Sequence, residues 1–216
     1  MTWRYHAARV LTNEWLDRDL QLFNVNATWT LSGPRELTAE VDAVTATSID
    51  STGRLILEEW GTYIYAEEND EIVWAGILHS SNDSGNGNRA ITCVSFSGYA
   101  NGRIYTDDSK EGYKVYVQDA FDIIRFIWSW IQKDSNADLG LQLSNDKSGY
   151  LIGSEDPGPK PVRENFPTQQ AYTQAVTNWQ SAINEPYVLA WWNTPDLGNE
   201  VNNLLVESQG EYVESH

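Results

Sequence analysis

The chain has 216 residues, 41% of them hydrophobic and 12% aromatic, which is enough to bury a sizeable core in one large domain or two small ones. Its formal net charge is −17, from 31 acidic and 14 basic side chains. Such a surface repels nucleic-acid phosphates and argues against direct recognition of DNA or RNA. The charge fits either simple solubility or a surface that DNA must pass without sticking.

A single cysteine, Cys93, excludes an intrachain disulfide and a cysteine-based zinc site. Its position in the apolar run 90–96 predicts a small buried strand residue. Arg4, His6 and Arg9 interrupt the N-terminal stretch, which therefore lacks the pattern of a secretory signal. No apolar run approaches the length of a membrane span. We expect a protein made in a cytoplasm, not exported by a standard signal and without a membrane span.

Residues 1–105 alternate between apolar and polar side chains, which predicts a β-rich region. Glycine and proline supply a turn at 32–35, and a flexible loop is expected at 80–88. Regularly spaced short strands favour a barrel or a sandwich. The expected strands are 25–31, 37–41, 55–57, 62–66, 72–78, 89–97 and 103–105.

The apolar period becomes helical across 117–133, where Phe126 and Trp130 widen the apolar arc. Residues 153–167 hold four of the seven prolines and predict a linker or an extended arm. Thr168 is the expected N-cap of the next helix, which ends before Pro186. We then expect a strand at 187–192, a short helix at about 196–206 and a strand-like tail at 210–216.

The acidic cluster Glu67, Glu68, Asp70 and Glu71 separates two strand-like runs and raises the question of catalysis. General acid and base chemistry needs two carboxyl groups in different environments. These four crowd one exposed turn, where we expect all of them to stay solvated and ionised. Asn69 followed by Asp70 is favourable turn chemistry. The cluster is therefore predicted to be the turn of a hairpin.

No other segment has a recognisable catalytic or metal-binding pattern. The three histidines are far apart in the sequence, and the loop 82–88 lacks the closing Glu of a calcium site. The segment 98–102 lacks the dinucleotide-binding spacing. There is no nucleophile elbow and no phosphate loop, whereas glycosidase carboxylates carry no local signature. We expect no catalytic, cofactor-binding or metal-binding residue, no cofactor and no enzymatic activity.

Several short phrases occur in an order that resembles one protein family. They are Trp3-Arg4-Tyr5, Glu14-Trp15-Leu16-Asp17-Arg18-Asp19-Leu20, Leu31-Ser32-Gly33-Pro34, Leu37-Thr38-Ala39, Leu57-Glu58-Glu59-Trp60-Gly61-Thr62-Tyr63-Ile64-Tyr65-Ala66, Gly76-Ile77-Leu78, Pro195-Asp196-Leu197-Gly198-Asn199-Glu200 and Tyr212-Val213-Glu214. In this order they resemble the minor tail proteins of long-tailed phages of actinobacteria, which are similar to the baseplate hub or tail-associated protein. The resemblance spans nearly the whole chain, and its motifs are structural.

The resemblance implies a homotrimeric ring whose subunits each carry two related, barrel-like tube domains and a helical domain. With the patterns above, it predicts an α+β fold: a β-rich, barrel-like tube domain followed by a smaller helix-containing domain. We expect the tube-type domain at 1–105, completed by strands near 187–216, and a helical or mixed insertion at 106–186 with the proline-rich loop 153–167. The segment 187–216 then begins a second tube-type domain, which is incomplete at His216 and leaves sheet edges unpaired.

The function that the resemblance implies is that of a structural protein of the virion, at the tail tip. The threefold ring closes or extends the tail tube and connects it to the receptor-binding parts. The implied partners are the distal tail protein ring, the tape measure protein and other minor tail proteins. Genomic DNA passes only in transit during ejection, and the charge of −17 suggests an acidic channel.

Two other functions stay open from the residues alone. A carbohydrate-binding module is suggested by the ten tryptophans, with Trp191 and Trp192, or Trp128 and Trp130, as the sugar platform. Against it, adjacent residues of a strand point to opposite faces, and Trp128 lies on the apolar arc of the expected helix. A cell-wall hydrolase is the second alternative, which zymography on cell-wall material would reveal.

Overall fold

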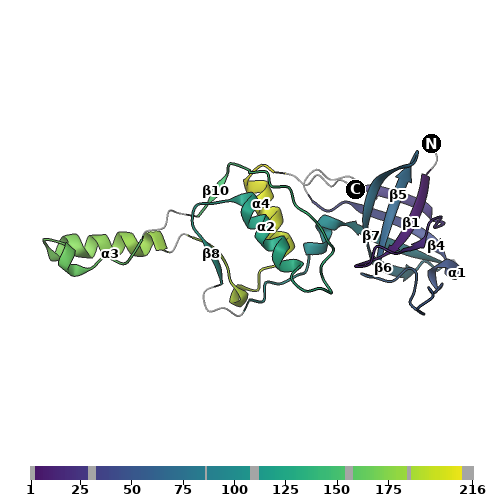
Figure 1. Cartoon of the computed structure of the whole chain (residues 1–216), viewed down its shortest axis with the longest axis horizontal. Coiled ribbons are helices and arrows are strands. Elements are labelled where there is room, and N and C mark those ends of the chain that lie inside the picture. Colours follow the sequence, from purple (N-terminus) through teal and green to yellow (C-terminus); the bar gives the residue numbers. More distant parts are fainter. Residues whose placement is uncertain are drawn as a thin grey trace. The chain divides into compact units, whose positions relative to one another are not determined.

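A computed structural model describes residues 3–28, 33–85, 87–107, 112–153, 158–183 and 186–210. The chain forms two compact units, whose elements are labelled in Figure 1. The described residues of the first unit fall within 3–101 and 131–142, and those of the second within 102–130 and 143–210. Each unit is therefore assembled from segments that are distant in the sequence.

The first unit is built on a seven-stranded antiparallel sheet with the order β2-β1-β5-β6-β7-β4-β3. Its elements are β1 (Trp3–Arg9), β2 (Trp15–Asp17), β3 (Phe23–Thr28), β4 (Glu36–Asp42), α1 (Ala43–Ala46), β5 (Thr62–Glu68), β6 (Glu71–Asp83), β7 (Asn88–Ser95) and the 3₁₀ helix η1 (Phe96–Ala100). Among the described residues no pairing joins β2 to β3. The predicted α+β class is confirmed, and the sheet is open rather than a closed barrel.

One face of this sheet covers the main hydrophobic core because apolar residues recur at every second position. On β4, Leu37 and Val41 are buried, and on β7, Ile91 and Cys93 point into the same core. Cys93 is fully buried, as predicted, and burial raises the pKa of its thiol. Leu78 of β6 completes this layer.

The opposite face is also buried near its centre. Tyr63 is covered there by Phe96, with ring centroids 5.4 Å apart, and burial raises the pKa of Tyr63 to about 12. The Tyr99 hydroxyl donates to the Ala137 carbonyl oxygen at 3.3 Å, which ties the segment 131–142 to η1. At Gly76 an added Cβ would lie 2.3 Å from the Val94 carbonyl oxygen, so β6 and β7 approach closely only because this residue is glycine.

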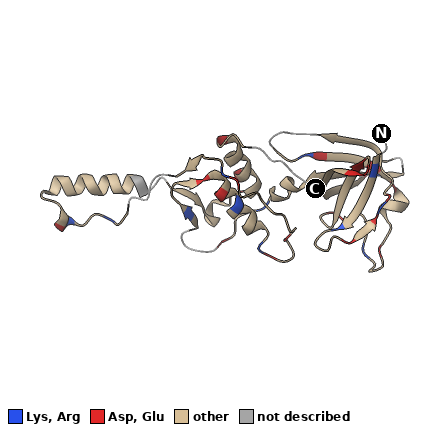
Figure 2. Cartoon of the chain, turned by 45° about the horizontal axis from the view of Figure 1, so that its top comes forward, with Lys and Arg blue, Asp and Glu red and all other residues tan. Residues whose placement is uncertain are grey.

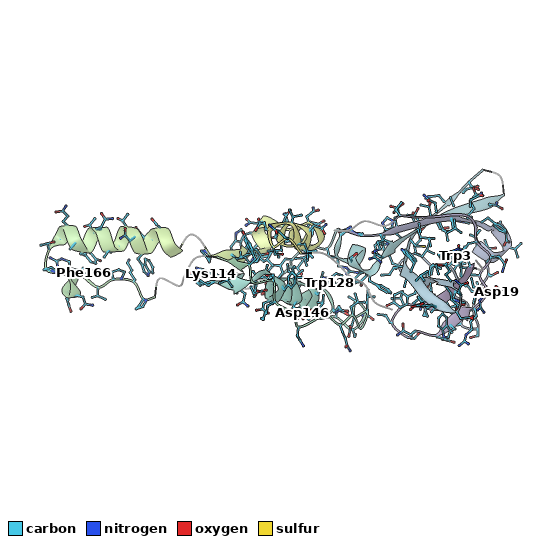
Figure 3. All side chains as sticks on the ribbon, turned by 90° about the horizontal axis from the view of Figure 1, so that it is seen from above. Trp3, Asp19, Lys114, Trp128, Asp146 and Phe166 are labelled. Carbon is cyan, nitrogen blue, oxygen red and sulfur yellow. The ribbon has the colours of Figure 1, made fainter. Side chains whose placement is uncertain are left out.

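The second unit has a helical core. Its elements are β8 (Tyr113–Val115), β9 (Gln118–Asp119), α2 (Ala120–Ile131), β10 (Leu151–Ile152), η2 (Arg163–Asn165), α3 (Gln169–Ile183), β11 (Tyr187–Leu189), η3 (Trp191–Asn193) and α4 (Leu197–Glu207). Figures 1 and 3 show α2 beside α4. Their buried residues include Ile123, Ile127, Trp128, Val201 and Leu204.

Three predicted helices are confirmed. The segment 117–133 contains α2, and 196–206 corresponds to α4. Thr168 caps α3, since its hydroxyl accepts from the Ala171 N–H at 3.1 Å. Asp196 caps α4 by accepting from the Asn199 N–H at 3.1 Å.

Three predicted strands are wrong wholly or in part. Residues 55–57 form only a bridge between Leu55 and Ile49, and 103–105 only a bridge between Ile104 and Asp196. The strand predicted at 187–192 ends at Leu189, because the chain turns into η3. β11 pairs with β8 in the second unit. A second tube-type domain at 187–216 stays a prediction, and 29–32 and 211–216 lie outside the described residues.

Candidate functional site

The acidic cluster at 67–71 is the tight turn between β5 and β6, as predicted. Glu68 pairs with Glu71 across the hairpin. Between them, Asn69 and Asp70 have φ angles of 53° and 68°, the left-handed conformation that a two-residue hairpin turn requires. Two of its carboxylates, Glu67 and Asp70, contact the same Arg4 guanidinium nitrogen.

Glu67 departs from the expectation that every carboxylate of the cluster stays solvated. Its side chain is only 17% exposed, and Oε1 lies 2.7 Å from an Arg4 guanidinium nitrogen. Oε2 lies 3.0 Å from His6 Nε2, while His6 Nδ1 lies 2.7 Å from the Arg18 carbonyl oxygen. His6 therefore lies between a carboxylate and a backbone carbonyl, each within hydrogen-bond distance of one of its ring nitrogens. Pairing across β1 and β5 explains this burial, which the local sequence does not show.

A shallow hollow of about 280 Å³ lies beside this ion pair and is the candidate site of the first unit. It is lined by His6, Trp15, Arg18, Glu67 and Ile72. The Trp15 ring lies 5.7 Å from the His6 ring, centroid to centroid, and the Arg18 guanidinium lies 5.2 Å from the indole centroid. Sequence reasoning missed this site because its residues come from separate strands. In the sequence, only Trp15 and Arg18 lie close together, within the segment 14–20.

A second ionic cluster in the same unit surrounds Arg9, which is 5% exposed. Its guanidinium donates to Glu58 Oε2 at 2.9 Å, to Asp50 Oδ2 at 2.5 Å and to the Leu55 carbonyl oxygen at 3.1 Å. A hydrogen bond from the Thr52 hydroxyl, and further ones from the Arg54 and Thr52 N–H groups and from Arg9, hold the pKa of Asp50 well below its usual range. Every charge here has a protein partner, so the cluster fastens the irregular segment 48–61 to β1.

In the second unit, Asp119 fastens a loop to the start of α2. Its carboxylate accepts from the N–H groups of Phe121 and Gly149, each at 2.9 Å, and from both the N–H and the hydroxyl of Ser148. Burial raises the pKa of Asp119, but these hydrogen bonds outweigh it and hold the pKa below its usual value. The arrangement is a structural clasp because all four donors belong to the protein.

The second unit also has a hollow of about 350 Å³. Its lining comprises Ile152, Gly153, Pro186, Tyr187, Glu200, Asn203, Leu204 and Glu207. The Tyr187 hydroxyl donates to Glu200 Oε1 at 2.7 Å, and burial together with this carboxylate raises the pKa of the phenol. The Tyr187 hydroxyl already donates to Glu200, and its raised pKa does not favour the phenolate, so this hollow offers no activated nucleophile.

The tryptophans considered as a sugar platform do not form one flat exposed surface. Trp128, labelled in Figure 3, is 2% exposed and belongs to the core of the second unit. Trp191 and Trp192 are 46% and 49% exposed, but their rings stand at 82° to each other. Both lie on η3 rather than on opposite faces of a strand, which corrects the sequence-based argument. Perpendicular rings do not form one flat surface.

The described part of the chain has neither a cluster of metal ligands nor a helix that could span a membrane. There, no three His, Cys, Asp or Glu side chains are grouped so as to hold a metal ion. His79 contacts the Trp60 ring, and His216 lies outside the described residues. In these same ranges, no helix combines the length and the apolar character needed to cross a membrane.

Comparisons with known proteins show a likeness to solved structures but none to a family model or a curated protein. Among solved structures, the tail protein from Neisseria meningitidis MC58 is similar with a TM-score of 0.36 and 12% sequence identity. The match covers 60% of this chain and 35% of that protein. A likeness this distant carries no argument about function.

Proposed function

We propose that the chain is a structural, non-catalytic component of a phage tail tip, of the baseplate hub class. The observation that carries the proposal is the ordered set of phrases that resemble minor tail proteins. These phrases fall on residues that build the fold: Trp3 begins β1, Gly76 allows β6 to approach β7, and Asp196 caps α4. A resemblance in such positions concerns architecture, which is what a tail protein of this class contributes.

The open sheet supports a role in assembly. Among the described residues, β2 and β3 have no strand partner on their outer edges, and Phe23 on β3 is 47% exposed. Unpaired strand edges are templates for pairing with another chain. In the proposal, these edges take part in contacts within a homotrimeric ring and with the distal tail protein ring, the tape measure protein and other minor tail proteins.

The charge supports the proposed acidic channel for DNA in transit. On β4, Glu36 and Glu40 alternate with the core residues Leu37 and Ala39 and therefore lie on the other face of the sheet. Acidic side chains at such positions would repel phosphates and limit sticking. They are the residues of the described sheet that we assign to the channel.

Sedimentation equilibrium of the full chain tests the assembly. The proposal expects a species with three times the mass of one chain that forms as the concentration rises. A monomer at every concentration, with a folded circular dichroism spectrum, would contradict self-association by this chain. Clearing of cell-wall material in zymography would contradict the absence of catalysis.

A further inference from the structure

The hollow beside Glu67 has features of a ligand site that a purely structural role does not need. It collects side chains from β1, from β2 and the residues after it, and from both strands of the β5–β6 hairpin. Its volume, about 280 Å³, is near the lower end of the range for small-molecule pockets. The hollow therefore suits a single compact ligand group.

Its apolar wall is an indole held in place by neighbouring rings. Trp15 is 43% exposed, so part of its ring faces solvent. The Tyr65 ring lies 5.4 Å from it at 56°, and the His6 ring lies 5.7 Å from it at 74°. An indole face is electron-rich and attracts polarised C–H groups. Because its neighbours fix it, little side-chain freedom would be lost on binding.

The polar wall offers both donors and an acceptor. In the described part of the chain, the Arg18 guanidinium lies over part of the Trp15 ring and makes no hydrogen bond or ion pair, so its N–H groups remain available at the edge of the indole face. The Glu67 carboxylate is the acceptor, oriented by Arg4 and by His6, which is itself only 7% exposed. Contacts within the protein therefore orient the Glu67 acceptor without a ligand.

We infer that this hollow binds an uncharged pyranose sugar. A sugar hydroxyl both donates and accepts, so it matches a wall that presents Arg18 donors next to the Glu67 acceptor. The C–H face of the same ring packs on the exposed part of the Trp15 indole. A carboxylate ligand would meet Glu67 and a chain of net charge −17, whereas an ammonium ligand would meet Arg18.

Saturation-transfer NMR on the full chain tests this inference with glucose, galactose, mannose, rhamnose and N-acetylglucosamine as probes. At least one should receive saturation from the protein. Arg18→Gln should weaken its binding tenfold or more, because the substitution removes the charge and most donors. Arg18 is exposed, so this variant should fold even if Trp15→Ala, expected to abolish binding, does not.

Trp192→Ala is the matched control, since it removes a similarly exposed tryptophan from the second unit. It should leave binding unchanged. The inference is overturned if no sugar of the panel binds, if Arg18→Gln binds as wild type does, or if only Trp192→Ala loses binding. Tighter binding of glucuronate than of glucose would overturn the uncharged assignment. Failure of this test leaves the proposed tail role unaffected, because that role does not depend on the hollow.

Discussion

Arg9 carries its charge inside the first unit at 5% exposure, which is stable only because oxygen atoms surround it. Asp50, Glu58 and the Leu55 carbonyl provide these acceptors. The same contacts hold the irregular segment between α1 and β5 in place. A strand was predicted there at 55–57, but none forms. An ion-pair network replaces strand pairing as the link to β1.

Leu78→Ala tests the core of the sheet at the residue scale. Leu78 is fully buried among the residues of β1, β4 and β7, so the substitution should lower the free energy of unfolding by about 2–5 kcal/mol. Urea unfolding followed by near-UV circular dichroism measures this loss. The control is Val44→Ala at a position that is 78% exposed, where we expect a change within about 0.5 kcal/mol. Equal stability of the two variants would refute the assigned core.

At the scale of elements, α3 differs from the other α-helices because none of its described side chains is buried. No charged residue occurs from 165 to 184, and the described part of α3 carries no red or blue in Figure 2. Residues of the preceding proline-rich segment contact α3. Trp179 Nε1 donates to the Gly158 carbonyl oxygen at 2.8 Å, and the Phe166 ring centroid lies 6.0 Å from that of Tyr172. A helix this short is marginal alone, so these contacts stabilise it.

The clasp formed by Asp119 predicts a pH dependence of the second unit. The pKa of Asp119 is lower in the folded chain than its ordinary value of 3.8. Its stabilising effect is therefore fully present above that value and is lost as the pH falls below it towards the folded pKa. Hydrogen exchange of the Phe121 and Gly149 amides should speed up, relative to Leu204 in α4, as the pH drops through this range.

Asp119→Asn provides the comparison for this effect. The variant should show faster exchange at both amides already at neutral pH, because the ionised acceptor is missing, and little further change on acidification. An unaltered pH profile in the variant would show that another group controls this loop.

The elements with a long, clear period were predictable from the sequence, and those fixed by distant contacts were not. The hairpin turn at Asn69 and Asp70 and the caps Thr168 and Asp196 are local chemistry, which the sequence displays. The strands at 55–57 and 103–105 failed because apolar composition does not provide a pairing partner. The hollow was missed because Trp15 and Glu67 meet only through the order of β2, β1 and β5.

At the scale of the whole molecule, the proposed function depends on the chain's negative charge and on the outer strands of the described sheet, β2 and β3. Replacing Glu36 and Glu40 by lysine in the phage should slow or arrest DNA ejection, since cations on the channel face would hold phosphates. Glu207→Lys in α4 is the control, since it makes the same kind of charge reversal once, at an exposed residue of the other unit. Ejection at the wild-type rate from particles with both sheet substitutions would count against the assigned channel face.

Immunogold electron microscopy of the source particles, with antibody raised against this chain, tests the central claim most directly. If the chain belongs to the tail tip, label will be confined to the far end of a long tail, with none on the capsid or along the tail shaft. Label along fibres, or none on any particle, would contradict a role at the tail tip.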